Sequence, residues 1–307
     1  MQRFLVGVGL ALWVVLGCRE TPSNEPTGDG PLRVTATTGM VADAARNLLG
    51  TAATVTALMG PGVDPHLYKA TQGDLARLRE ADLVLYNGLH LEGKLNDLLT
   101  RLGQTQAVVA LGELLPDSLR RQAPGFEGAY DPHLWFDVAR WRTAVGYLAD
   151  TLSARYPHLA DSIGRNRAQY TQALDSLDRW VRAELSRLPP ERRVLVTAHD
   201  AFGYFGAAYG VEVRGLQGLS TAAEFGVRDV SELVDFLVRR KIPAIFVESS
   251  VSPRAIESVV AQAAARGHRV RVGGTLYSDA LGAAGTPEGT YIGMVRANVQ
   301  TLVEALK

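Results

Sequence analysis

Short apolar runs alternate along most of the chain with longer stretches whose apolar residues recur at helical spacing. This alternation is typical of α/β proteins built on parallel sheets, and each half of the chain offers about four strands. The predicted strands are residues 32–37, 54–58, 82–86, 106–110, 193–197, 212–216, 244–247 and 269–272. The predicted helices between and after them are residues 40–49, 71–80, 201–209, 227–240, 253–266 and 290–306.

In the middle of the chain the strand pattern is replaced by two helices. The first covers residues 137–156 and is expected to begin with Asp137 as its N-cap. The second covers residues 160–187, carries its apolar residues on one face and is roughly 40 Å long at 1.5 Å per residue. We therefore expect an α/β fold of two lobes, each with a roughly four-stranded parallel sheet flanked by helices, joined by one long, stiff helix.

The first residues predict an export signal. Arg3 is followed by an apolar run over residues 4–16, too short for a membrane span of ~20 residues but suited to a secretory signal core. The run ends at Val15-Leu16-Gly17-Cys18, which resembles a bacterial lipobox with cleavage before Cys18 and lipid on its sulfur. A plain signal peptide followed by an incidental cysteine is the alternative.

The rest of the sequence predicts a folded body on a tether. Cys18 is the only cysteine, so no intrachain disulfide can form, and a lipid anchor explains it better than a structural role does. The expected divisions are a signal peptide (1–17), a polar flexible tether (18–31), an N-terminal lobe (32–157), a linking helix (158–188) and a C-terminal lobe (189–307). We expect an exported protein, periplasmic or on the cell surface, anchored to a membrane through Cys18.

The charge balance argues against a nucleic-acid partner. The chain has 32 basic and 32 acidic residues, and removing the signal peptide with Arg3 leaves a net charge of −1. A nucleic-acid-binding surface would require an excess of basic residues. No later apolar run in the sequence approaches membrane-spanning length.

Candidate chemistry lies in two Asp-Pro-His tripeptides and two later residues. Asp64-Pro65-His66 follows the second predicted strand, Asp131-Pro132-His133 precedes a long helix, and His199 and Asp279 follow strands of the second half. Proline makes each tripeptide a rigid turn. Ligands of parallel sheets gather beyond the carboxyl ends of strands, so two facing lobes could bring these four residues to one point.

Three imidazoles and a carboxylate would suit zinc, and a bidentate Asp279 would partly meet the preference of manganese for oxygen. The residues alone leave other roles open. The gaps of 67, 66 and 80 residues match no short metal motif. A histidine in a loop is commonly solvated, and Asp279 could cap a turn.

Several longer stretches resemble the metal-binding solute-binding lipoproteins of bacterial zinc and manganese ABC importers, the TroA-like family. The resemblance covers nearly the whole mature chain. The stretches are Gly62-Val63-Asp64-Pro65-His66, Tyr86-Asn87-Gly88-Leu89, Asp131-Pro132-His133-Leu134-Trp135, Ala198-His199-Asp200-Ala201-Phe202-Gly203-Tyr204-Phe205, Gly218-Leu219-Ser220-Thr221, Phe246-Val247-Glu248-Ser249-Ser250 and Tyr277-Ser278-Asp279-Ala280-Leu281-Gly282.

The resemblance implies that one Zn²⁺ or Mn²⁺ ion binds between two lobes, with His66, His133, His199 and Asp279 as its ligands. Two departures bear on the metal. Members dedicated to manganese commonly have glutamate at the position of His199, and members dedicated to zinc often carry a His-rich loop, whereas residues 87–130 hold one histidine, His90. Members with three histidines and one aspartate bind either metal.

Other polar and aromatic residues have weaker predictions. Asp64, Asp131, Asp200 and Glu248 are candidates to orient the imidazoles, as metal-binding histidines usually require. The aspartates could equally hydrogen-bond within their own turns, and Glu248 could instead form a salt bridge between the lobes. His90 is expected to be structural, and His158 and His268 to be solvated. Trp135, Trp141 and Trp180 are expected to pack in the core or between the lobes.

The function predicted from these features is capture of a divalent transition metal and its delivery to an ABC permease in the membrane, by a monomer that is not an enzyme. Two alternatives remain. A surface adhesin would also be anchored outside the cell. A zinc hydrolase would need a coordination position left open for water, which four protein ligands do not leave.

Overall fold

The structure, a computed structural model, describes residues 30–123 and 128–307. The predicted signal peptide, Cys18 and most of the predicted tether lie outside these ranges. Residues 31–307 form one compact unit. Among the helices of the described residues, none combines the length and apolar character needed to cross a membrane.

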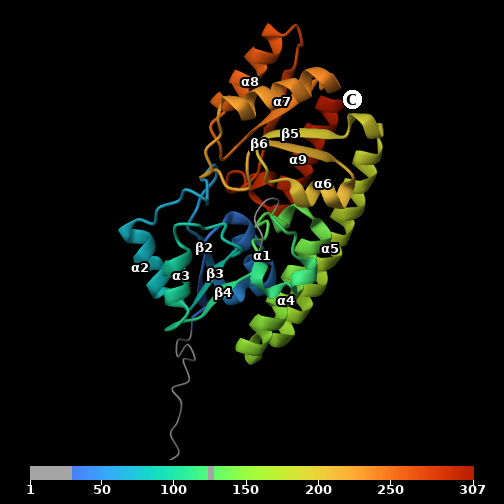
Figure 1. Cartoon of the computed structure of the whole chain (residues 1–307). Helices are drawn as coiled ribbons and strands as arrows, with labels where there is room; N and C mark the ends of the chain where they lie inside the picture. The colour runs from blue at the N-terminus through green and yellow to red at the C-terminus, as the bar shows by residue number, and fades with distance from the viewer. Residues whose placement is uncertain (1–29, 124–127) are drawn as a thin grey trace, which may run out of the picture. The chain divides into compact units, whose positions relative to one another are not determined.

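The first half of the chain builds a four-stranded parallel sheet, as predicted (Figure 1). Its strands lie in the order β2-β1-β3-β4 and are connected by helices, the usual crossover between parallel strands. The elements are β1 (Leu32–Ala36), α1 (Gly39–Leu49), β2 (Ala53–Ala57), α2 (Gln72–Glu80), β3 (Leu83–Tyr86), α3 (Asn96–Leu102) and β4 (Val108–Ala110).

Both faces of this sheet are covered by helices. Along β3, Leu83 and Leu85 pack in the same apolar cluster as α1, while Val84 and Tyr86 pack in a second cluster with residues of α2 and α3. Because successive residues of a strand point to opposite faces, a strand buried on both faces is apolar throughout. This explains why residues 83–86 show no polar positions.

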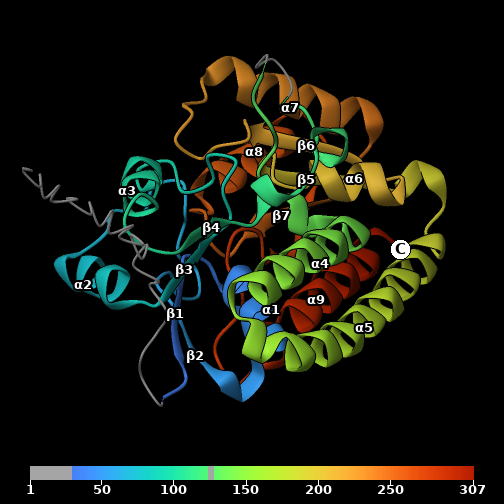
Figure 2. The ribbon, with the colours of Figure 1, turned by 90° about the horizontal axis from the view of Figure 1, so that it is seen from below.

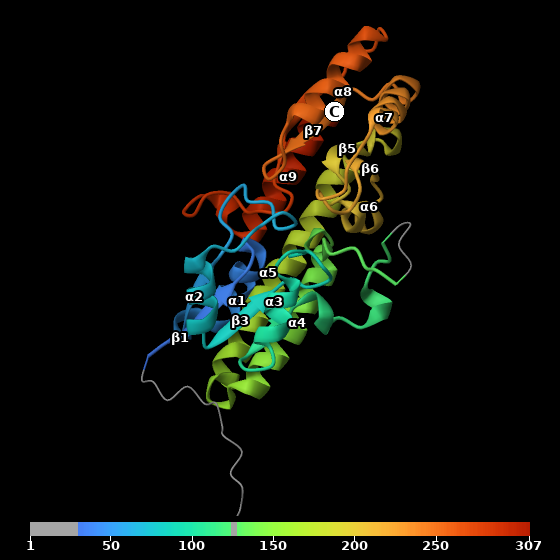
Figure 3. The ribbon, with the colours of Figure 1, turned by 60° about the vertical axis from the view of Figure 1, so that its left-hand side comes forward.

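The two predicted middle helices form as α4 (Val138–Arg155) and α5 (Ala160–Ser186). The Asp137 carboxylate caps α4 by accepting hydrogen bonds from the backbone N–H groups of Ala139 and Arg140. The helix α5 has 27 residues, and Figure 3 shows it running from beside the first sheet to the strands of the second half. The predicted apolar positions of this helix are all buried: Ile163, Tyr170, Leu174, Leu177, Val181 and Leu185.

The second half also forms four strands, but they pair differently from the first. Two parallel pairs form, β5-β6 and β7-β8, and β5 lies beside β7. The elements are β5 (Val194–His199), α6 (Gly203–Tyr209), β6 (Glu212–Gln217), α7 (Val227–Arg240), β7 (Ala244–Glu248), α8 (Arg254–Ala265), β8 (Arg271–Leu276) and α9 (Tyr291–Leu306).

The last helix, α9, joins the two halves together with α5. It packs against β8 and also against α5 and α1, and Figure 2 shows α1, α4, α5 and α9 gathered side by side. One apolar cluster extends from Leu32 in β1 to Leu306 in α9 and includes residues of both halves. The division into residues 32–157, 158–188 and 189–307 stays a prediction, since the described residues from 31 onward form a single unit.

Candidate metal centre

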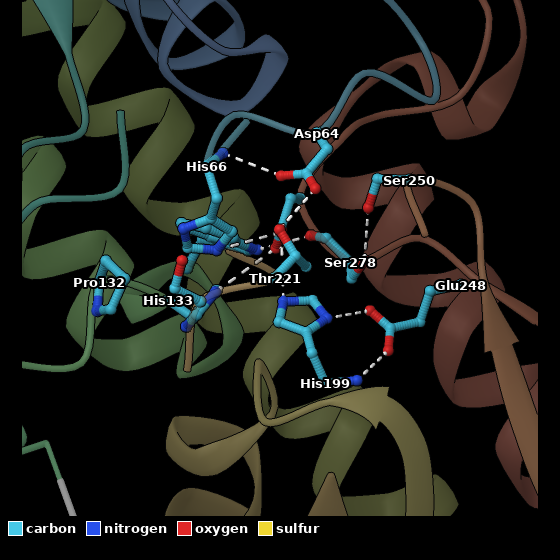
Figure 4. Close-up of polar contacts among 12 residues, drawn as sticks. Asp64, His66, Pro132, His133, His199, Thr221, Glu248, Ser250 and Ser278 are labelled. Carbon is cyan, nitrogen blue, oxygen red and sulfur yellow. Dashed lines mark hydrogen bonds and ion pairs between the residues drawn. The ribbon is translucent and has the colours of Figure 1, made fainter. Parts of the chain in front are cut away.

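Four side chains from four separate segments converge at one buried point (Figure 4). His66 lies in the loop after β2, His133 just before α4, His199 at the end of β5, and Asp279 after β8. One donor atom of each lies within 4.8 Å of the others. The exposed fraction of each residue is 4% or less.

The positions of these residues follow from the parallel topology. His199 is the last residue of β5, and Glu248 is the last residue of the neighbouring β7. Asp279 follows β8 by three residues, and the loop that carries His66 leaves the carboxyl end of β2. The carboxyl ends of parallel strands share one edge, where backbone groups are no longer paired within the sheet and polar side chains can gather.

The two Asp-Pro-His tripeptides adopt the same local turn. In each, the Oδ1 of the aspartate accepts a hydrogen bond from the backbone N–H of the histidine, at 2.9 Å for Asp64 and His66 and 3.0 Å for Asp131 and His133. This is an Asx turn, in which the side chain replaces a backbone acceptor. The turn and the fixed φ of proline together direct each imidazole toward the cluster.

Two of the imidazoles also contact a carboxylate through their second ring nitrogen. Nδ1 of His133 lies 2.8 Å from Asp131 Oδ1, and Nδ1 of His199 lies 2.6 Å from Glu248 Oε2. Glu248 Oε1 in addition accepts a hydrogen bond from the His199 backbone N–H at 2.9 Å. These contacts fix the ring orientation and leave the Nε2 atoms directed at the cluster, as Figure 4 shows for His199 and Glu248.

The other two acidic candidates have different positions. The second oxygen of Asp64 accepts a hydrogen bond from the Thr221 hydroxyl at 2.5 Å, so this carboxylate connects the His66 loop to the second half of the chain. Asp200 is half-buried, and no hydrogen bond joins its carboxylate to any of the three imidazoles, all of which are described. Burial raises the pKa of Asp200, and the neighbouring Asp131 raises it further.

Both oxygens of Asp279 face the imidazoles. Its Oδ2 lies 3.5 Å from Nε2 of His66 and 3.2 Å from Nε2 of His199, and its Oδ1 lies 3.6 Å from Nε2 of His133. Four ligands arranged tetrahedrally at ~2.0–2.2 Å from zinc would be about 3.4 Å apart. The three separations therefore fit a single ion enclosed by the four residues.

The pKa shifts of His66 and Asp279 favour the forms of these two residues that bind a metal. Burial lowers the pKa of His66 to about 3, which keeps its imidazole neutral and able to bind a metal. Burial would raise the pKa of Asp279, but the nearby histidines, His199 first, outweigh it and hold this pKa below its usual value. The Asp279 carboxylate is therefore ionised.

The donor atoms lack other partners among the described residues. The three Nε2 atoms and both Asp279 oxygens are buried without a hydrogen-bond partner there. Leaving a buried polar atom unpaired costs roughly 1–3 kcal/mol. Binding of a cation explains why five such atoms, all facing one point, lack hydrogen-bond partners.

Two residues that hold the site were present in the sequence stretches but received no role from sequence reasoning. Thr221 binds Asp64 as described, and the Asn87 amide donates a hydrogen bond of 3.0 Å to the backbone oxygen of Pro132, beside His133. Their presence in the stretches Gly218–Thr221 and Tyr86–Leu89 was the available signal. Neither hydrogen bond could be inferred, because each joins residues far apart in the chain.

The remaining histidines lie outside the cluster. His90 and His158 are exposed. His268 is half-buried rather than solvated, with its Nε2 2.8 Å from the backbone oxygen of Ile242. Of the three, none belongs to the group of metal-binding side chains found in the described residues.

The fold and the buried set of three histidines and one aspartate define a metal-binding α/β protein. Residues 34–305 match the model of the family ZnuA, "Zinc-uptake complex component A periplasmic". The chain belongs to this family, and the resemblance predicted from its sequence is confirmed.

Two relatives and one solved structure show how similar this chain is to known proteins. It is 49% identical to the manganese-binding lipoprotein MntA of Bacillus subtilis, over all of this chain and 99% of that protein. It is also 49% identical to the zinc-binding protein TroA of Treponema pallidum, over 92% of each. The structure of periplasmic zinc-binding TroA from Treponema pallidum superposes with a TM-score of 0.87, covering 90% of this chain and 99% of that one.

Proposed function

We propose that the protein captures one divalent transition-metal ion, zinc or manganese, and delivers it to an ABC permease for uptake. The observation that carries this proposal is the convergence of four buried donor groups that have no other partner among the described residues. The names of the relatives support it, since one is a manganese-binding lipoprotein and another a zinc-binding protein. The ion is the cargo of the protein.

The ligands in this proposal are His66, His133, His199 and Asp279. Three nitrogen donors favour zinc over manganese in intrinsic affinity, following the stability order of divalent ions. Both Asp279 oxygens face the cluster, so a bidentate carboxylate could give manganese a fifth donor. The site suits both ions.

We further propose that the protein is not an enzyme. A catalytic zinc site keeps one position open for water, with a base beside it. Here four protein donors surround the point where the ion would lie, and both oxygens of Glu248 are engaged by His199. This arrangement supports retention of an ion rather than activation of water.

The proposed location is outside the cytoplasm. We propose an exported monomer whose Cys18 carries a lipid anchor that holds the protein to a membrane. The support is the lipobox-like sequence before Cys18 and the word lipoprotein in the name of MntA from Bacillus subtilis.

Titration of the metal-free protein with Zn²⁺ and Mn²⁺ tests the proposal directly. We expect one ion per chain and tighter binding of zinc. His199→Ala should raise the Kd for zinc by more than the 10- to 100-fold typical of losing a residue that only supports a ligand, because it removes a ligand itself. In a strain that lacks the native gene, expression of the His199→Ala variant should restore less uptake of both metals than expression of the native protein does.

His158→Ala is the matched control, because it removes an exposed histidine of the same chain. Its affinity and uptake should equal those of the native protein. A native protein that retains neither metal, or a His199→Ala variant that binds as tightly as the native protein, would contradict the proposal.

A further inference from the structure

Trp135 stands two residues after His133, and its polar groups bond to the second half of the chain. The indole Nε1–H donates a hydrogen bond of 3.1 Å to the backbone oxygen of Ser278, the residue directly before Asp279. The backbone oxygen of Trp135 accepts a hydrogen bond of 2.7 Å from the Tyr291 hydroxyl at the start of α9. Trp135 is completely buried, so both bonds are shielded from water.

The Trp135 ring also contacts an imidazole of the site. The ring centroids of Trp135 and His133 are 5.3 Å apart with an interplanar angle of 66°, a favourable edge-to-face arrangement. One side chain therefore touches the imidazole contributed by the first half and holds the backbone beside the carboxylate contributed by the second half.

The residue that Trp135 holds is also fixed from the other side. The Ser278 hydroxyl lies 2.9 Å from the Ser250 hydroxyl in the loop after β7 (Figure 4). Ser278 is fully buried, so this segment has little freedom to move when Asp279 meets an ion. The backbone on the His133 side is held in turn by Asp131 and by the Asn87 amide.

We propose that Trp135 is a positioning residue that sets the distance between His133 and Asp279 and thereby favours the smaller ion at the site. It does not bind the metal itself. Nε2 of His133 lies 3.6 Å from Asp279 Oδ1, close to the separation of about 3.4 Å for two ligands of tetrahedral zinc. Manganese prefers more ligands at longer distances than zinc does. A fixed, short distance between the donor atoms of His133 and Asp279 therefore lowers the affinity for manganese more than the affinity for zinc. This inference rests on the proposed metal-binding function.

Two replacements at position 135 test the inference. Trp135→Phe removes the N–H donor and part of the ring. Incorporation of 3-benzothienylalanine at the same position keeps the ring size and removes only the donor. We expect each to raise the Kd for Zn²⁺ roughly 3- to 10-fold, the range for loss of one neutral hydrogen bond, and to change the Kd for Mn²⁺ less than about twofold. The ratio of the two Kd values should fall.

Trp180→Phe is the matched control. Trp180 lies in α5 and packs against the same apolar core, with the Arg296 guanidinium over its ring, and it is outside the metal-binding cluster. This substitution should lower the melting temperature of the metal-free protein and leave both Kd values unchanged. If Trp135 only packed in the core, its replacement would weaken the binding of both metals equally and lower the melting temperature as well.

The inference is overturned if the benzothienylalanine protein binds zinc like the native protein, or if the Zn²⁺ to Mn²⁺ ratio does not move. Either result would show that Trp135 packs in the core without setting the distance between His133 and Asp279. Failure of the native protein to bind Zn²⁺ or Mn²⁺ would contradict the proposed function itself. The two failures are distinguished by the native titration, which is measured first.

Discussion

At the scale of single residues, the pKa values of His66 and His199 are shifted in opposite directions because their carboxylate neighbours differ. Burial dominates at His66 and lowers its pKa to about 3. At His199, burial opposes the charged form, but Glu248 and then Asp279 outweigh it and raise the pKa well above its ordinary value. In the metal-free protein the pKa of His66 is therefore lowered and that of His199 raised.

The raised pKa of His199 predicts how metal affinity depends on pH. A metal must displace the proton of a charged His199, because an imidazolium cannot bind it. We expect metal binding to release a proton increasingly as pH falls through the raised pKa of His199, and the affinity to fall roughly tenfold per pH unit below that pKa. Calorimetry in buffers of different ionisation enthalpy measures the proton release. An affinity that is equal at pH 7.5 and pH 5 would contradict this prediction.

The same pKa shifts act in opposite directions on the stability of the metal-free fold. The raised pKa of His199 contributes stability below the unfolded value near 6.5, and this is lost as pH rises through the folded pKa. The lowered pKa of His66 contributes stability above 6.5, and this is lost as pH falls toward about 3. Measurements of metal affinity at low pH should therefore be accompanied by a measurement of folding.

The sequence could suggest which carboxylates support the imidazoles but could not choose among them. Asp200 follows His199 directly, yet no hydrogen bond joins its carboxylate to any of the three imidazoles, all of which are described. Glu248 is far away in sequence, yet it reaches His199 because β7 lies beside β5. The choice depends on strand order, which a single sequence does not contain.

At the scale of elements, the placement of His199 depends on a glycine in the neighbouring strand. Gly215 in β6 pairs with Thr197 in β5. A Cβ added at Gly215 would lie 2.5 Å from the backbone nitrogen of Asp200 and 2.6 Å from the carbonyl carbon of His199. These are backbone atoms, so the contact can be relieved only by moving β5, which ends in the proposed ligand, and β6 relative to each other.

Gly215→Ala is therefore expected to destabilise the protein by about 1–3 kcal/mol, the usual cost of overpacking, and to weaken zinc binding. Chemical denaturation and zinc titration measure the two effects. Gly218→Ala is the control, since a Cβ there meets nothing within 4 Å, and it should leave both quantities near their native values. Native zinc affinity in Gly215→Ala would show that the end of β5 tolerates displacement.

The elements themselves were largely predictable from apolar periodicity, with two instructive exceptions. The helix α3 (Asn96–Leu102) was not predicted because seven residues make fewer than two turns, too few for a clear pattern. The strand predicted at 269–272 is shifted to Arg271–Leu276, since Gly273 and Gly274, which normally weaken a strand, lie inside β8. There Gly274 adopts a φ of 147°, beside a register shift at Ile245 and Phe246.

At the scale of the whole molecule, the two halves are joined by more than the predicted helix. The helix α9 packs on α5 and α1 as well as on β8, and one apolar cluster contains residues of both halves. The periodicity of residues 290–306 predicted the helix, but not its packing on α5 in the middle of the chain or on α1 near the opposite end. Two long helices crossing between the halves favour small adjustments on metal binding over wide opening.

A shared core and a site built from both halves predict that metal stabilises the molecule as one unit. His66 and His133 come from the first half, and His199 and Asp279 from the second, so the bound ion cross-links them. At a free metal concentration of 100 times the Kd, binding to the native state alone adds about 2.7 kcal/mol. In a protein of this size the melting temperature should rise by several degrees, in a single transition.

Thermal unfolding of the metal-free protein, with and without Zn²⁺, measures this shift, and excess chelator should reverse it. His199→Ala should unfold at one temperature irrespective of zinc, while His158→Ala should respond like the native protein. If the ion were held by one half alone, only that half would gain stability and the single transition would split into two. A split transition on adding zinc would therefore separate the halves thermodynamically and contradict a site shared between them.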